Sequence, residues 1–316
     1  MESAPDIAVV IPTLERETRL AFALEALAQQ TLDRDRFEVI VVRASGGRRS
    51  GRAEPPDGLR VRFVDCAAAG TAIQRNVGWR TAQAPLIAFT DDDCRPSPGW
   101  LEGMMGAEAG GGTILLGPTE PDPDERPLLA GLARTINNPR PSGWYETCNI
   151  AYPRELLEAV GGFDESIAFL GEDTDLAMRA TKSGADVRFV VGALVWHAVD
   201  PRNLGTALRD VVRRSSRPAI VARHRELRAS LWRGVFTDRD HARLLLALAG
   251  MLAARRAPAL CALACAPYVK HHLGVAPLTP WRAVRFPFRL LSFAILDAAE
   301  TLAFAASSVR HRVLVL

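Results

Sequence analysis

Short apolar runs and segments with a helical period alternate along the first half of the chain. Four runs of strand length are expected to form strands: 7–11, 37–42, 59–64 and 86–90. Two segments with apolar residues three or four positions apart are expected to form helices: 18–29 and 71–82. The second begins with Thr71 and Gln74 at the spacing of a capping box. This order of elements is typical of an α/β fold with a doubly wound, mostly parallel sheet.

The pattern continues less regularly up to His197. Further strands are expected at 114–117, 148–152, 187–191 and 194–196, and further helices at 153–160 and 172–183. The proline- and aspartate-rich stretch 118–127 and the residues up to about 140 predict a loop or short helix.

After His197 the pattern changes to helical segments that are rich in arginine. These segments are 209–228, 242–254 and 288–306. The longest uncharged apolar stretch, 244–254, is shorter than the roughly 20 residues that span a bilayer. The last segment contains Arg289, Asp297 and Glu300, so we interpret it as amphipathic and not transmembrane.

Charge divides the chain at the same place. Residues 1–200 carry more acidic than basic side chains, whereas residues 201–316 carry 19 Lys and Arg against 6 Asp and Glu, counted from the sequence. A basic segment attracts anionic partners such as phospholipid head groups, nucleic acid or phosphorylated substrates. We therefore expect a sheet domain over 1–200 and a basic helical extension over 201–316.

The five cysteines form no C-x-x-C pair, and the first residues lack the basic and long apolar stretches of a signal peptide. Both observations favour free thiols in a reducing compartment and predict a cytoplasmic location.

Candidate chemistry gathers where the predicted strands end, which is where doubly wound sheets bind ligands. Pro12 and Thr13 end the first strand, Arg43 follows the second, and the triplet Asp91, Asp92, Asp93 follows the fourth. Adjacent carboxylates repel one another unless a cation binds, and oxygen ligands suit Mg²⁺ or Mn²⁺ on a diphosphate. A solvated acidic turn is the alternative interpretation of the triplet.

Four further residues stand out, each with a structural alternative. Glu172 and Asp173 open a predicted helix, where they complement the helix dipole or supply a general base. His197 is a core residue, a phosphate donor or a metal ligand. Arg75 and Asn76, on the helix before the aspartates, bind a nucleotide or pack. The phosphate-loop and dinucleotide-binding glycine motifs are missing, which disfavours those enzyme classes.

Five motifs together resemble the family-two glycosyltransferases of bacteria, whose catalytic domain has the GT-A fold. They appear in the family's order: Val9-Val10-Ile11-Pro12-Thr13, Arg75-Asn76-Val77-Gly78, Phe89-Thr90-Asp91-Asp92-Asp93, Val160-Gly161-Gly162-Phe163-Asp164-Glu165 and Gly171-Glu172-Asp173-Thr174-Asp175-Leu176 with Arg179. The resemblance implies an inverting transfer of a sugar from a nucleotide-sugar donor to a hydroxyl acceptor.

The resemblance also implies roles for individual residues. Asp93, Asp91 and His197 would hold Mn²⁺ or Mg²⁺ on the donor diphosphate. Asp173 would be the catalytic base, with Glu172 shaping the acceptor pocket.

Other residues are assigned to the two substrates by the same resemblance. The donor would contact these side chains: Pro12, Thr13, Arg43, Arg75, Asn76, Asp91 and Asp92. Asn149 and Trp144 would lie on the acceptor side.

One departure from the family concerns the nucleotide base. Relatives carry an acidic residue after the second strand, and this chain has Val41-Val42-Arg43-Ala44-Ser45 there. UDP-sugars are favoured, with GDP- and dTDP-sugars open, and Arg43 is an alternative phosphate contact.

The extension is expected to select the acceptor and to face a membrane. Its basic helices carry interleaved aromatic residues: Trp232, Phe236, Trp281, Phe286 and Phe288. That combination suits an anionic surface at the inner face of the plasma membrane and a lipid-linked or cell-envelope glycan acceptor. A solvated arginine face over a helical core is the alternative.

Three other functions compete with this prediction. A nucleotidyltransferase would need a basic, glycine-rich loop after the first strand, and Pro12-Thr13-Leu14-Glu15 does not supply one. An inactive, glycosyltransferase-like binding subunit stays possible because of the missing acidic residue. Nucleic-acid binding is not expected, because the arginine-rich tail contains no recognisable reading module.

Overall fold

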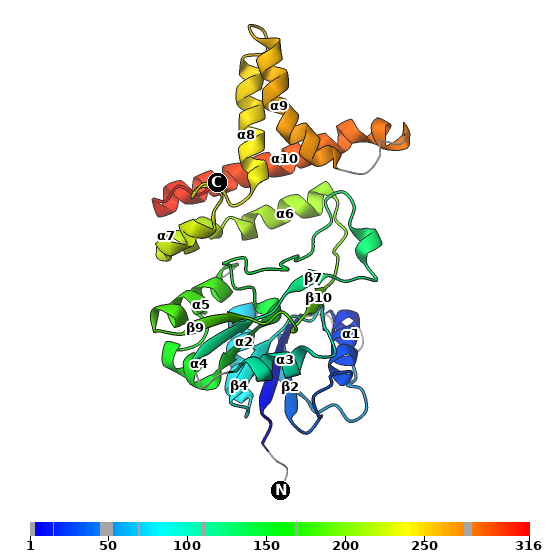
Figure 1. Cartoon of the computed structure of the whole chain (residues 1–316), viewed down its shortest axis with the longest axis vertical. Helices are drawn as coiled ribbons and strands as arrows, with labels where there is room; N and C mark the ends of the chain where they lie inside the picture. The colour runs from blue at the N-terminus through cyan, green and yellow to red at the C-terminus, as the bar shows by residue number, and fades with distance from the viewer. Residues whose placement is uncertain are drawn as a thin grey trace. The chain divides into compact units, whose positions relative to one another are not determined.

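The computed structural model of the protein describes residues 4–14, 16–44, 53–68, 70–108, 112–167, 170–274 and 280–316, without the side chains of 214 and 280–283. The chain forms two compact units. Residues 1–129 and 134–200 form the first unit, and residues 130–133 and 201–316 form the second (Figure 1).

A seven-stranded sheet is the centre of the first unit, in the order β3-β2-β1-β4-β8-β6-β9. Its strands are β1 (Ile7–Thr13), β2 (Phe37–Ala44), β3 (Val61–Cys66), β4 (Leu86–Phe89), β6 (Thr113–Leu116), β8 (Ile150–Pro153) and β9 (Asp186–Phe189). Strand β8 is antiparallel to both of its neighbours, and the other pairs are parallel. The predicted mostly parallel sheet is confirmed.

Helices cover both faces of this sheet because the central strands alternate apolar side chains between two cores. On β1, Ile7 and Val9 face one core, whereas Ala8 and Val10 face the other. The first core is covered by α1 (Glu17–Ala28) and α3 (Trp100–Ala107). The second is covered by α2 (Thr71–Thr81), α4 (Arg154–Val160) and α5 (Glu172–Lys182).

A second, three-stranded sheet has the order β5-β10-β7. Its strands are β5 (Cys94–Pro96), β7 (Thr119–Pro121) and β10 (Val195–His197). Strands of this length carry almost no periodic signal, so the sequence predicts only β10. The register pairs His197 with Cys94, which brings the late histidine beside the aspartate triplet.

One local prediction in the first unit is wrong, and one helix, α3, was not predicted. Gly103 and Gly106 weaken the helical pattern of the short α3 sequence. The capping box at the start of α2 does not form, because no side chain caps this helix. Instead Gln74 Nε2 donates to the carbonyl oxygens of Thr13 and Val42, at 2.9 Å each, and so ties together the ends of β1 and β2.

The second unit is helical. Its elements are α6 (Leu204–Arg214), α7 (Arg217–Arg223), the 3-10 helix η3 (Arg225–Ser230), α8 (Arg239–Leu252), α9 (Pro258–Leu273) and α10 (Pro280–His311). Helices α8 and α9 run side by side as a hairpin and stand across α10, which also packs against α6 and α7 (Figure 1). The sequence pattern did not predict α9, and it gave α10 fewer residues than the 32 observed.

Helix α10 is long and apolar enough, over Val284–His311, to cross a membrane by length and composition alone. Only 17% of that window is buried in the protein. The charged residues that led us to expect an amphipathic helix therefore do not exclude a membrane location, and where they lie becomes important below.

Candidate active site

The ends of β1 and β4 bring polar residues of two sequence motifs into contact, because these strands are neighbours in the sheet. Thr13 Oγ1 donates to Asp92 Oδ2 at 2.6 Å, and Asp92 is completely buried. Burial raises the pKa of Asp92 to about 7, against the opposing effect of Arg16. Asp92 thus anchors the aspartate triplet to the first strand.

Arg16, which the sequence pattern did not single out, is the cation nearest to two of the aspartates. Its guanidinium lies 2.5 Å from Asp92 Oδ1 and 2.5 Å from Asp93 Oδ2. The Arg16 side chain is 53% exposed, whereas the Asp92 side chain has no exposed surface. Arg16 therefore neutralises the acidic triplet from the solvent side.

Asp93 and His197 form a pair that could hold a metal ion. His197 Nε2 lies 3.7 Å from Asp93 Oδ1. His197 Nδ1 lies 2.8 Å from the carbonyl oxygen of Ala198, which only accepts, so Nδ1 carries the proton and Nε2 keeps a free electron pair. Ligand atoms of Asp93, Cys94 and His197 all lie within 4.8 Å of one another.

The donor set of this pair fits Mn²⁺ or Mg²⁺ better than a soft metal. Asp93 offers a hard carboxylate oxygen, which suits Mn²⁺ and Mg²⁺, and His197 adds an imidazole nitrogen. Burial raises the pKa of the Cys94 thiol well above its ordinary value, so this thiol does not readily become a thiolate ligand. Asp91 does not belong to this close group within the described residues; its partner is Arg75.

Arg75 joins the aspartate triplet to the second acidic motif. Its Nη2 donates to Asp91 Oδ1 at 2.8 Å, and its Nη1 donates to Glu172 Oε1 at 2.8 Å. Arg75 and Glu172 are buried, and Glu172 Oε1 also accepts from Thr71 Oγ1 at 2.7 Å. A planar guanidinium therefore fixes the separation between the two motifs.

Asp173 is the next residue along α5. Its Oδ1 accepts from the backbone N–H of Thr174 at 2.7 Å, while part of its surface is accessible to solvent. Burial, helped by Glu172 and opposed by Arg75, raises the pKa of Asp173 to about 8. A carboxylate with a raised pKa is a stronger base than an ordinary aspartate.

Asn76 is placed differently from the expected donor contact. Its Nδ2 donates to the Phe163 carbonyl and to Glu165, and its Oδ1 accepts from Phe163 N–H and from Trp79 Nε1. Both donors and both lone pairs are thereby used, so no hydrogen-bonding capacity is left for a ligand. Asn76 holds the turn at Gly162, where a Cβ would lie 2.6 Å from Asn76 Oδ1.

The two residues expected on the acceptor side are also tied into the protein. Asn149 is buried; it accepts from Trp100 Nε1 and donates to the carbonyls of Pro118 and Ala193, all at 2.8 Å. The Trp144 carbonyl accepts from Thr174 Oγ1 at 2.5 Å, which places Trp144 beside Asp173 in the fold. Trp144 thus lies near the second acidic motif through its backbone.

Pro12 and Arg43 lie at the ends of β1 and β2. Pro12 is buried, and the Arg43 guanidinium lies 3.9 Å above the ring of Phe63 and 3.2 Å from Glu17 Oε2. Residues 45–52, which follow β2, lie outside the described residues. Arg43 is therefore a partly used cation beside an aromatic ring at the end of β2.

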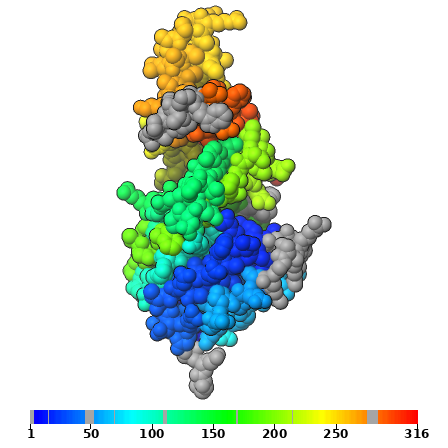
Figure 2. All heavy atoms as spheres, turned by 90° about the vertical axis from the view of Figure 1, so that its right-hand side faces the viewer, coloured from blue at the N-terminus to red at the C-terminus, as the bar shows by residue number. Residues whose placement is uncertain are grey.

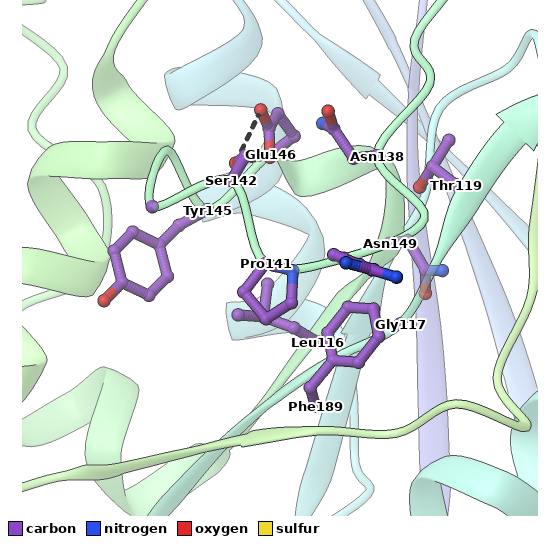
Figure 3. A pocket seen from close by; sticks show the side chains of 12 residues that line it. Leu116, Gly117, Thr119, Asn138, Pro141, Ser142, Tyr145, Glu146, Asn149 and Phe189 are labelled. Atoms are coloured by element: carbon purple, nitrogen blue, oxygen red, sulfur yellow. Dashed lines mark hydrogen bonds between the residues drawn. The ribbon is translucent and has the colours of Figure 1, made fainter. Parts of the chain in front are cut away.

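A pocket opens next to the second acidic motif (Figure 3). It is lined by Leu116, Gly117, Thr119, Asn138, Arg140, Pro141, Ser142, Gly143, Tyr145, Glu146, Asn149 and Phe189. In Figure 3 the apolar side chains of Leu116, Pro141 and Phe189 lie together, with polar side chains beside them. Glu146 accepts from Ser142 Oγ at 2.9 Å and contributes to the raised pKa of Asp173. Glu146 therefore links the lining of the pocket to Asp173, which is not itself a lining residue.

The structure brings together most of the residues that the sequence singled out, but it adds two that the sequence pattern missed. Arg16 carries no distinguishing signal, because arginine is abundant throughout the chain. Gln74 was noted for its capping-box spacing, which predicted a contact at the start of α2. Its side chain instead donates to carbonyl oxygens at the ends of β1 and β2.

Two family models match the chain. Residues 8–126 match the glycosyl transferase family 2 model, and residues 135–304 match the glycosyl transferase family group 2 model. The chain is 30% identical over 220 residues to validoxylamine A glucosyltransferase of Streptomyces hygroscopicus subsp. limoneus, covering 57% of this chain and 49% of that protein. It is 25% identical over 211 residues to glycosyltransferase AglE of Haloferax volcanii, covering 62% of this chain and 68% of that protein.

Solved structures resemble the chain as a whole. The mannosyltransferase PcManGT from Pyrobaculum calidifontis, in complex with GDP-Man and Mn²⁺, aligns with a TM-score of 0.54 and 17% identity over 98% of this chain and 88% of that one. S. aureus TarS 1-349 in complex with UDP-GlcNAc aligns with a TM-score of 0.53 and 15% identity over 98% and 92%. These likenesses confirm the GT-A type fold. The chain spans about half the length of the first curated relatives that it matches.

Proposed function

We propose, from the premise that the chain belongs to glycosyl transferase family 2, that it moves a sugar from a nucleotide-sugar donor to a hydroxyl acceptor with inversion at the anomeric carbon. The observation that carries the proposal is the pairing of Asp93 with His197 Nε2. Arg75 links this pair to the second acidic motif, because it contacts both Asp91 and Glu172. Asp173, the carboxyl with the raised pKa, follows Glu172. Donor-holding and proton-accepting groups are thereby collected at one edge of the sheet.

Asp93 and the free Nε2 of His197 would hold Mn²⁺ or Mg²⁺, with Asp91 as a further candidate ligand. A bound divalent ion would supply charge stabilisation for the diphosphate leaving group. Thr13 keeps Asp92 in place, and Asp92 together with Arg16 keeps the triplet compact. Pro12, Thr13 and Arg43, at the strand ends, would line the nucleotide, while Asn76 would act through the turn that it holds.

Asp173 would be the general base, and Glu172 a positioning residue. The acceptor hydroxyl loses its proton to the Asp173 carboxylate while its oxygen forms a bond to the anomeric carbon. The bond from that carbon to the diphosphate oxygen breaks, and the diphosphate leaves with the electron pair. Attack from the side opposite the leaving group inverts the anomeric centre. Arg75 holds Glu172, and with it the start of α5, at the required separation from Asp91.

The acceptor would enter beside Asp173, at the pocket lined by Asn149 and Glu146 and next to Trp144. A lipid-linked or cell-envelope glycan precursor is the acceptor class that the basic second unit supports, since such precursors carry phosphate. A peripheral position at the inner face of the plasma membrane agrees with that acceptor. UDP-sugars are favoured as donors, and the Arg43 position keeps GDP- and dTDP-sugars open.

The proposal is tested with a panel of nucleotide sugars. Calorimetric binding of UDP, GDP and dTDP in the presence of Mn²⁺ or Mg²⁺, followed by donor hydrolysis, should select one nucleotide. Asp93→Asn should abolish the metal-dependent part of the binding, whereas Asp124→Asn, at an exposed aspartate, should not.

Failure of a folded protein to bind any of these nucleotides would refute the proposal. Binding without hydrolysis or transfer would instead support an inactive, glycosyltransferase-like subunit.

A further inference from the structure

We propose that the second unit docks on an anionic lipid bilayer through the exposed apolar faces of α8, α9 and α10, with arginines at the ends of those faces contacting lipid phosphates. The inference extends the membrane location proposed above and names the surface, but it does not require transferase activity. It rests on three observations within the second unit: where its polar side chains point, where its apolar side chains point, and where its arginines lie.

Two polar side chains of the helical hairpin, His241 and Tyr268, point inward. His241 Nε2 on α8 lies 3.3 Å from Glu300 Oε2 on α10, and both side chains are buried. Tyr268 on α9 donates to Asp297 Oδ2 on α10 at 2.6 Å, also in a buried position. The two acidic side chains of α10 are thus satisfied between the helices, as acids are in helices that contact lipid.

The outward face of α10 is apolar over most of its length. Its exposed large side chains recur every three or four residues or at multiples of that spacing: Val284, Phe288, Leu291, Ile295, Leu302 and Val309. Phe288, one of the aromatic residues expected at an interface, is 73% exposed, and Leu302 is 71% exposed. A helix that places its acids inside and leucines outside reverses the usual arrangement of a water-soluble bundle.

The far end of the α8–α9 hairpin is apolar as well. Leu252 is 91% exposed, and Met251, Leu260 and Leu263 are exposed beside it. In Figure 2 the upper end of the hairpin, coloured yellow to orange, is uncovered on the face turned to the viewer. Exposed large apolar side chains therefore lie on both the hairpin and α10, and exposed apolar surface of this kind marks a site of interaction with a membrane or a partner.

The two hairpin helices approach closely through small residues. A Cβ on Gly250 would lie 2.4 Å from Ala264 Cβ, and Cys261 lies next to this contact. Small residues at a helix–helix contact are favoured in lipid, where packing and not burial from water holds helices together.

Arginines lie at the tip of the hairpin and at the end of α10. Arg255 and Arg256 occupy the exposed tip between α8 and α9, and Arg310 is exposed at the end of α10. The acidic side chains of α10 point inward, where they face His241 and Tyr268. Long arginine side chains can reach phosphates while their stems stay in the apolar boundary.

The same geometry argues for lying in the interface and against crossing the bilayer. The 14-residue α8 and the 16-residue α9 have lengths of roughly 21 and 24 Å at about 1.5 Å per residue, which is less than the roughly 30 Å hydrocarbon core. Helix α10 packs along its inner side against α6, α7 and α8, all of which belong to the same unit. An anionic bilayer therefore covers the apolar faces while the arginines remain at head-group level.

Vesicle flotation of the full chain tests this surface. The protein should float with vesicles of phosphatidylglycerol and phosphatidylcholine, and much less with phosphatidylcholine alone. The variant Leu252→Glu/Leu260→Glu/Leu263→Glu should lose more than about tenfold in partitioning, because charge is introduced into the apolar boundary. Arg255→Gln/Arg256→Gln should keep part of the binding but weaken its dependence on the anionic lipid.

The matched control is Phe22→Glu/Leu128→Glu/Val191→Glu, which places the same charges at exposed apolar positions of the first unit and should float like the wild type. Nucleotide binding without vesicles should be unchanged in every variant, which separates failure of this inference from failure of the transferase proposal. The inference is overturned if the wild type does not float, or if the hairpin variant floats equally well. It is also overturned if the hairpin variant only converts a dimer into a monomer.

Discussion

The two units of this chain differ in which side chains they bury and which they expose. The first unit buries apolar strands between helices and leaves its carboxylates at the strand ends, where Arg16 and Arg75 compensate them. The second unit buries carboxylates between helices and leaves leucines outside. Most of the large apolar side chains that are exposed in the described residues belong to the second unit, although it is the smaller one. The comparison supports the proposal that the first unit is surrounded by water and that the second unit contacts lipid.

The largest expected effect concerns Asp173, the proposed general base in the first unit. Asp173→Asn should lower the rate of transfer by about 10²–10⁴, because the amide cannot accept the acceptor proton. Initial rates at saturating donor would measure it, with Asp186→Asn, at an exposed aspartate of β9, as the control. A variant that retains more than a tenth of the activity would assign the base to another group.

The second prediction compares an inward and an outward side chain of α10. Phe304 contacts His241 and is 1% exposed. The substitution Phe304→Ala should therefore lower the free energy of unfolding by about 3–5 kcal/mol. Leu302→Ala, at an exposed position on the same helix, should cost less than about 0.5 kcal/mol in the absence of lipid. Thermal or denaturant unfolding without vesicles gives both values. Equal costs would show that the outer face of α10 is buried in solution.

The third prediction concerns pH. Burial raises the pKa of Asp173 to about 8, whereas an unfolded aspartate titrates near its ordinary value of 3.8. The folded protein therefore binds more protons than the unfolded chain between these two values, so this group lowers stability as pH rises from about 4 to about 8. Asp173→Asn should flatten that decline and stabilise the folded protein by about 1–3 kcal/mol at pH 8. A decline of the same slope in the variant would contradict the assignment.

The smallest expected effect concerns Arg16. Its ion pairs with Asp92 and Asp93 involve a half-exposed side chain, so they are worth at most about 1 kcal/mol. Arg16→Ala should therefore tighten Mn²⁺ binding to the free protein by up to about fivefold, because a competing cation is removed. Calorimetric titration with Mn²⁺ measures this change. Weaker metal binding in the variant would instead make Arg16 part of the metal-bound arrangement.

The main strands of the large sheet and its mostly parallel arrangement could be predicted from the sequence, since apolar runs such as Ile7–Ile11 have the length and composition of buried strands. The three-residue strands β5 and β7 could not, because their pairing is set by tertiary register. The motifs indicated Asp93, His197 and Asp173, but not that Asn76 uses all its hydrogen bonds inside the protein. Membership of a motif and contact with a ligand are different properties, and only the partners of a side chain distinguish them.

The inward direction of Asp297 and Glu300 was beyond the sequence as well. Their presence in α10 suggested a helix with a solvated charged face. The structure pairs them with Tyr268 and His241 inside the bundle, so the face of α10 that carries the acidic side chains is not the solvated face. Hydropathy counts each charge equally, whereas its energetic effect depends on which way the side chain points.

The double contact of Arg75 couples the positions of the two acidic motifs in the proposed catalytic site. A single rigid guanidinium sets the distance between Asp91 and Glu172, so a substitution that shifts one carboxylate also displaces the other. Changes that broaden the choice of donor at the triplet should therefore be accompanied by changes in acceptor KM. Directed evolution of this protein would accordingly advance faster through paired substitutions on α2 and α5 than through single ones.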